Sequence, residues 1–164
     1  MSSVVLTTLL AALAFAAFHV PLPRRRGGRW DLAPLHGRVA GIFGVAYHLL
    51  LLPAVTALPA PSWAVAAGLG WMVLDAVLDG AWLAGATFDA RPLRDGVHLV
   101  AGVWLVAAGW THGPGLGLAG SALTLAFVAR LALDGTEQPT PAWLLRVNAL
   151  LNMLWMLGVA AALA

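Results

Sequence analysis

Residues 71–85, WMVLDAVLDGAWLAG, combine two properties that seldom occur together. They lie within an apolar segment long enough to cross a lipid bilayer, yet they include Asp75 and Asp79. A charged side chain near the middle of a bilayer costs at least about 2.5–3.5 kcal/mol on insertion scales. Because ionisable residues at such depth are rare and commonly functional, the sequence predicts a site at these two carboxylates.

The composition of the whole chain is typical of a membrane protein. Of its 164 residues, 61% are hydrophobic and only 10% are charged, whereas soluble domains are about 45–50% apolar and about 25% charged. The net charge is only +2 and the basic residues are all arginines beside apolar segments, which argues against nucleic-acid binding. The chain has no cysteine, so disulfides, thiolate metal sites and thiol catalysis are excluded.

Six apolar segments are each about as long as a transmembrane helix, which needs about 17–25 residues. We expect helices in all six, because runs of this length are too long for the strands of a membrane barrel. Most linkers are short, and only residues 21–34 and 87–94 are expected to be longer loops. The sequence therefore predicts an all-α membrane protein, one domain over residues 1–164, with spans at residues 3–20, 35–58, 63–86, 95–111, 116–133 and 143–164.

The arginines predict the orientation of this bundle. With the N-terminus outside, every arginine falls in an inner loop or within a turn or two of one, and the outer loops have none. Inner loops of membrane proteins are enriched in basic residues, so we expect both termini outside. The lack of lysine and the abundance of alanine, arginine and glycine favour a bacterial plasma membrane. The arginines are Arg24, Arg25, Arg26, Arg29, Arg38, Arg91, Arg94, Arg130 and Arg146.

Two helices resemble each other in sequence, which suggests an internal repeat. Residues 73–85 read VLDAVLDGAWLAG and residues 146–158 read RVNALLNMLWMLG. A fainter match relates the histidine and glycines of residues 36–44 to those of residues 112–120. Each half would contain three helices, giving an inverted repeat with its shared site near the midplane. Chance similarity between Ala- and Leu-rich helices is the alternative. The aligned pairs are Asp75 with Asn148, Asp79 with Asn152, and Trp82 with Trp155.

Helical spacing places the polar residues of both segments on single faces. A rise of about 1.5 Å per residue sets Asp75 level with Asn152 and Asp79 level with Asn148, so two polar rungs are expected between antiparallel helices. The surrounding residues predict a pocket that opens to the cytoplasmic side, with Arg38 or Arg146 paired to Asp79. The expected ligand-binding residues are Trp71, Asp75, Asp79, Trp82, His98, Asn148, Asn152, Trp155, Arg38 and Arg146.

Purely structural roles are an alternative for these side chains. Buried Asp and Asn residues can simply hold helices together, each hydrogen bond contributing about 0.6 kcal/mol. Arg130 and Asp134 are four residues apart, which predicts a structural ion pair rather than a site. The glycines are expected to let helices approach closely.

The histidines raise the separate hypothesis of a b-type haem protein. His98 and His112 are fourteen residues apart and share a helix face, as two haem ligands on one helix would. Their partners would be His36 and His48, but these are twelve residues apart and point about 120° from each other. Only one of the two helices therefore fits haem, and no cofactor is predicted.

Four function classes remain open from the sequence. The first is transport or binding of a small solute or proton. A homodimer is expected in this case, because six short helices are few to enclose a path through the membrane. The second is an enzyme acting on a lipid or isoprenoid, in which Asp75, Asp79 and His98 carry out acid/base catalysis. The third is a structural or accessory membrane subunit, and the fourth is the haem protein. The lipid bilayer is the one partner common to all four.

Overall fold

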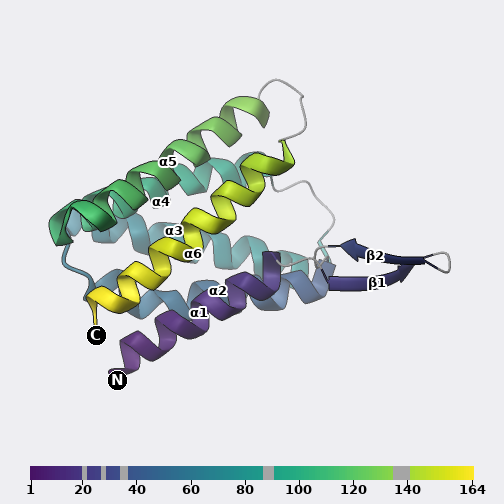
Figure 1. The fold of residues 1–164 in the computed structure, drawn as a ribbon, viewed down its shortest axis with the longest axis horizontal. Helices are drawn as coiled ribbons and strands as arrows, with labels where there is room; N and C mark the ends of the chain where they lie inside the picture. Colours follow the sequence, from purple (N-terminus) through teal and green to yellow (C-terminus); the bar gives the residue numbers. More distant parts are fainter. Residues whose placement is uncertain (20–21, 27–28, 34–36, 87–90, 135–140) are drawn as a thin grey trace.

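The computed structural model forms six helices and one short hairpin over its described residues, which are 1–19, 22–26, 29–33, 37–86, 91–134 and 141–164 (Figure 1). The predicted helical fold is thereby confirmed. The elements are α1 (Ser3–His19), β1 (Leu22–Arg26), β2 (Arg29–Ala33), α2 (Gly37–Ala57), α3 (Ser62–Leu83), α4 (Arg91–His112), α5 (Pro114–Asp134) and α6 (Ala142–Ala162).

Four helices in the described part of the chain are long and apolar enough to cross a membrane, which indicates a membrane location. They are α2, α3, α5 and α6, over residues 38–57, 62–83, 114–133 and 142–162. The helix α1 is apolar but has 17 residues. The helix α4 has 22 residues and begins at Arg91, four residues before the predicted start. A proline in the first turn, as at position 92, costs a helix no hydrogen bond.

The segment expected to be a long loop after α1 contains an antiparallel hairpin instead. Strand β1 pairs with β2, with Arg24 opposite Asp31 and Arg26 opposite Arg29. The hairpin extends from the end of the bundle opposite the two termini (Figure 1). Its sequence signal is the Gly-Gly pair at positions 27–28 between two short runs, a combination typical of tight hairpins. The proline and three arginines of β1 obscured this signal, because β1 shows no alternation of apolar and polar residues and β2 alternates only over residues 29–32.

The helices form a closed ring. Each helix packs against its neighbours in the sequence, and α1 packs against α6 to close the circle. Both termini lie at one end of the bundle (Figure 1). Because α3 packs on α2 and α4 while α6 packs on α5 and α1, the two helices with matching sequences lie across the ring from each other rather than side by side.

Glycines let neighbouring helices approach closely, as the sequence predicted. A Cβ atom added at Gly41 would lie 2.7 Å from the carbonyl oxygen of Asp79 and 2.8 Å from the nitrogen of Leu83, both on α3. On α5, a Cβ atom at Gly117 would meet the indole of Trp110 on α4. Gly41 thus faces the following helix and Gly117 the preceding one, so this aligned pair does not make matching contacts in the two halves.

We expect Gly41→Ala to destabilise the bundle, because the added methyl group would meet the backbone of α3 rather than a movable side chain. Overpacking of this kind costs about 1–3 kcal/mol. Thermal unfolding in mild detergent would measure it, with Gly70→Ala as the control because nothing lies within 4 Å of a Cβ atom there. Equal unfolding temperatures for the two variants would contradict the close packing of α2 on α3.

Candidate functional site

A cavity of about 500 Å³ lies inside the ring and is lined by side chains from all six helices. Its walls are mostly apolar, with Phe15, Phe18 and Phe127 among them, and its polar groups concentrate on α2, α3 and α4. The lining residues of α1 and α5 come from the last turns of those helices, and those of α6 begin at its first turn. The cavity therefore extends toward the end of the bundle that carries the arginines.

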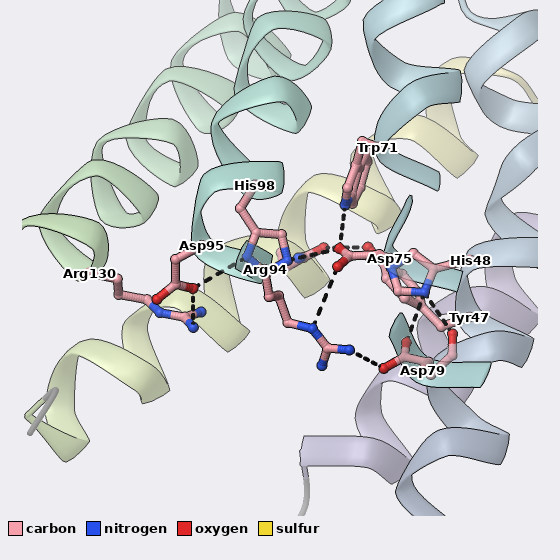
Figure 2. Close-up of polar contacts among 11 residues, drawn as sticks. Tyr47, His48, Trp71, Asp75, Asp79, Arg94, Asp95, His98 and Arg130 are labelled. Atoms are coloured by element: carbon pink, nitrogen blue, oxygen red, sulfur yellow. Dashed lines mark hydrogen bonds and ion pairs between the residues drawn. The ribbon is translucent and has the colours of Figure 1, made fainter. Parts of the chain in front are cut away.

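Asp75 lies at the centre of the polar groups and is only 1% exposed. The indole Nε1–H of Trp71 donates a hydrogen bond to its Oδ2 atom at 2.9 Å. The Nε2 atoms of His98 and His48 lie 3.1 Å and 3.4 Å from the same oxygen. Nitrogen atoms from three helices thus surround one buried carboxylate (Figure 2).

Arg94 joins the two aspartates. Its Nε atom lies 3.5 Å from Oδ1 of Asp75, and its terminal nitrogen donates a hydrogen bond to Asp79 (Figure 2). The guanidinium carbon lies 4.3 Å from the centre of the Trp82 ring, which is a cation–π distance. Two buried carboxylates therefore share one guanidinium, and Trp82 covers its other side.

His48 connects the same two aspartates from α2. Its Nδ1 atom lies 3.1 Å from Oδ2 of Asp79 and 2.8 Å from the carbonyl oxygen of Gly44. A side chain at Gly44 would collide with the carboxylate of Asp79, so glycine is required for α2 to present His48 at this depth. With one ring nitrogen on each aspartate, His48 can accept a proton at one carboxylate and release it at the other.

A second ion pair lies beside this cluster. Arg130 donates a hydrogen bond to Oδ1 of Asp95 at 2.6 Å, and Nδ1 of His98 lies 3.7 Å from the same oxygen. The imidazole of His98 also stacks on the ring of Phe127, with centres 4.7 Å apart and planes 14° apart. His98 therefore stands between two carboxylates, Asp75 on one side and Asp95 on the other.

On the α6 side, the polar groups of the cavity include two side-chain amides. Asn148 and Asn152 are both buried and line the cavity. The hydroxyl of Tyr47 donates to the carbonyl oxygen of Asn152 at 3.4 Å, while the carbonyl oxygen of Asn148 has no partner among the described residues. The predicted rungs are therefore not direct contacts, because the cavity separates α6 from α3 and Asn152 bonds to α2.

The structure brings together most of the residues that the sequence predicted as a site. Seven of them line the cavity: Trp71, Asp75, Asp79, His98, Asn148, Asn152 and Arg146. Trp82 reaches the cluster through Arg94. Trp155 does not line the cavity and packs edge-on against Trp104, with ring centres 4.8 Å apart. Arg38 is exposed and lies outside the cavity, near Gly85.

The predicted arginine partner of Asp79 was wrong. The guanidinium comes from Arg94, not from Arg38 or Arg146. The sequence offered a signal, because Arg94 and His98 are four residues apart and share a helix face. That signal was missed because the helix was expected to begin only at Asp95. Tyr47 was also missed, and its position next to His48 was the available clue.

The histidines that the structure describes are not arranged as a pair of haem ligands. His112 is exposed at the last residue of α4, and His36 lies outside the described residues. His48 and His98 both face the carboxylate of Asp75, which occupies the place between them. Within the described ranges, no group of three or more His, Asp or Glu residues could hold a metal ion. The side chain of Asp134 also lies outside the described residues, and Arg130 pairs with Asp95.

We expect Arg94→Gln to destabilise the protein strongly, because it leaves two buried carboxylates without their shared cation. Breaking a buried ion pair by removing one partner costs about 3–5 kcal/mol. The double variant Arg94→Gln/Asp79→Asn should recover part of this loss, because it also removes one of the uncompensated charges. Unfolding in detergent with increasing denaturant would measure both variants.

Arg38→Gln is the matched control, because Arg38 is exposed and lies outside the cavity. An Arg94→Gln protein as stable as Arg38→Gln would contradict the shared ion pair. A double variant less stable than Arg94→Gln alone would contradict it as well.

No protein-family model, no curated protein and no solved structure matches this chain.

Proposed function

We propose that this chain is a multi-pass protein of the plasma membrane in which all six helices span the bilayer, with both termini outside. Support comes from the positions of the arginines, which favour the cytoplasm for the end where the cavity opens. The 17 residues of α1 are at the lower limit of a span. The charges of α4 are compatible with a span because Arg94 and Asp95 are paired inside the ring.

We further propose that the cavity binds a small molecule from the cytoplasmic side and exchanges a proton with it. The observation that carries this proposal is the convergence of His48 and His98 on Asp75 beside a cavity of about 500 Å³. Imidazoles bind and release protons near neutral pH, and a buried carboxylate can orient and stabilise them. Trp71, Trp104 and Trp155 pack on one another next to the cavity, so a solute is expected to enter from the cytoplasmic end.

A purely structural role is less consistent with the same cluster. Side chains that only join helices satisfy one another, whereas the carbonyl oxygen of Asn148 has no partner among the described residues. An arrangement built only for stability would also not require eight His, Asp and Arg side chains around an open cavity. These side chains are His19, His48, Asp75, Asp79, Arg94, His98, Arg130 and Arg146.

An enzyme acting on a lipid or isoprenoid is the second candidate. It is favoured by the apolar wall, in which Phe127 stacks on His98 next to Asp75. In such an enzyme His98 would transfer the proton, Asp75 would orient it, and the aromatic rings would stabilise a cationic intermediate. The likeness of α3 and α6 stays a hypothesis of an inverted repeat, supported by their Asp and Asn residues lining one cavity.

We expect native mass spectrometry of protein extracted in mild detergent to find a bound small molecule in the wild type and to lose it in Asp75→Asn. The substitution removes the negative charge that orients both imidazoles but keeps the size of the side chain. Thr124→Val is the matched control, because Thr124 bonds only to backbone carbonyls of α4 and α5 and does not line the cavity.

The bound mass should persist in Thr124→Val. Bare protein in all three samples would overturn the proposal, as would a bound mass that Asp75→Asn retains. The two candidates then separate in vesicles containing the purified protein. A transporter moves the identified molecule across the membrane unchanged, whereas an enzyme converts it, and in either case His98→Gln should reduce the rate.

A further inference from the structure

The cavity lining contains more guanidinium groups than carboxylates. Asp75 and Asp79 share one of them, that of Arg94. Arg130 and Arg146 also line the cavity, and Asp95, which pairs with Arg130, is buried and is not part of the lining. The lining therefore holds two guanidinium groups beyond the one that the two aspartates share.

The guanidinium groups of Arg130 and Arg146 have N–H donors without a hydrogen-bond partner among the described residues. Arg146 is exposed and forms no hydrogen bond or ion pair with any described residue. Arg130 uses a terminal nitrogen on Asp95, but its Nε atom is buried and has no partner in the described ranges. Guanidinium groups bind carboxylate and phosphate oxygens through paired hydrogen bonds. These two side chains can thus hold an oxyanion between them.

Asn148 provides a second, independent indication of a ligand. It is 6% exposed, it lines the cavity, and its carbonyl oxygen has no hydrogen-bond donor among the described residues. Leaving a buried carbonyl oxygen unpaired costs free energy, which a donor on a bound molecule would recover. Arg146 and Asn148 both line the same cavity, the first exposed and the second buried.

The wall between these polar groups is apolar. It is formed by Phe15 and Phe18 of α1, Phe127 of α5, and Leu145 and Ala149 of α6. Such a surface favours an apolar ligand body, because burying that body releases the water which would otherwise cover both surfaces. A fully hydrophilic anion would gain nothing from this wall.

We propose that the cavity binds an organic anion, in which a carboxylate or phosphate is held by Arg130 and Arg146 and an apolar body lies along the phenylalanines. A hydroxyl or N–H group on that body donates to Asn148. This inference rests on the proposed function of the cavity as a binding site and specifies the ligand class. The anion can be an amphiphile from the bilayer or a soluble molecule from the cytoplasm.

Isothermal titration of the protein in phosphatidylcholine nanodiscs with two pairs of probes tests the proposal. Benzoate and benzamide form the soluble pair, and oleate and oleamide form the lipid pair, with empty nanodiscs as the blank. We expect the acid of one pair to bind at least tenfold more tightly than its neutral amide. The pair that shows this preference identifies the source of the ligand.

Substitutions of Arg146 and Arg130 test whether these two side chains cause the preference for the acid. Arg146→Gln should reduce the affinity for the acid about tenfold and leave the amide unchanged, because it removes one guanidinium that has no structural partner. Arg130→Lys keeps a cation beside Asp95 but removes the planar guanidinium that can form paired hydrogen bonds. It should therefore also lower the affinity for the acid. Arg38→Gln is the control, since Arg38 is an exposed arginine outside the cavity.

Acids and amides that bind equally well, with Arg146→Gln unchanged, would overturn the anion inference and leave the cavity as a binding site. If neither acids nor amides bind to the wild type, both this inference and the proposed function of the cavity fail. An acid preference that survives in Arg146→Gln and Arg130→Lys would place the anion elsewhere and also contradict the inference.

Discussion

The buried carboxylate of Asp75 is the constraint on which the rest of the structure depends. A single charge at this depth requires donors on several sides, because water cannot replace them. Nitrogen atoms from three helices lie around Oδ2, those of His48 on α2, Trp71 on α3 and His98 on α4. The guanidinium of Arg94 on α4 forms an ion pair with Oδ1. Satisfying Asp75 therefore fixes the relative depth and rotation of α2, α3 and α4.

The other half of the ring is held by different forces. The helices α4 and α5 approach through glycines, and a Cβ atom at Gly109 would lie 2.7 Å from the carbonyl oxygen of Leu116. In the described residues, the polar tie from α6 to the rest of the ring is the hydrogen bond between Tyr47 and Asn152 at 3.4 Å. Charged pairs thus fix α2, α3 and α4 and tie α5 to α4 through Arg130 and Asp95, whereas α1 and α6 are held mainly by apolar packing and supply part of the cavity wall. That division is compatible with the proposed binding site.

Much of this arrangement could be predicted from the sequence, and the physical reasons are clear. Helical periodicity and a fixed rise per residue place Asp75, Asp79, Asn148 and Asn152 at similar depth inside the bundle, and all four line one cavity. Periodicity does not say which helices are neighbours. The rungs between α3 and α6 were therefore expected as direct contacts, whereas the ring places these helices on opposite sides.

The partner of Asp79 and the hairpin were not predicted, although the sequence held a signal for each. Hydropathy places the start of a helix where charged residues end, but Arg94 and Asp95 are charged residues inside α4 that are paired within the ring. The strand β1 is rich in arginine and lacks the alternation by which half-buried strands are identified, and β2 alternates only over residues 29–32. The pairing of Asp79 depends on a contact between residues distant in sequence, and the hairpin depends on its turn.

The central claim is a cavity inside a membrane bundle that opens to the cytoplasm, and cysteine accessibility tests it most directly. The chain has no cysteine, so a single introduced thiol has no background. Ala149→Cys lies in the cavity wall, and Leu150→Cys, at a position 61% exposed on the outer surface of the bundle, should face lipid. A charged, water-soluble methanethiosulfonate should modify Ala149→Cys in inside-out vesicles but not in right-side-out vesicles, and should not modify Leu150→Cys in either. Equal reactivity of the two cysteines, or modification of Ala149→Cys only from the outside, would contradict the account.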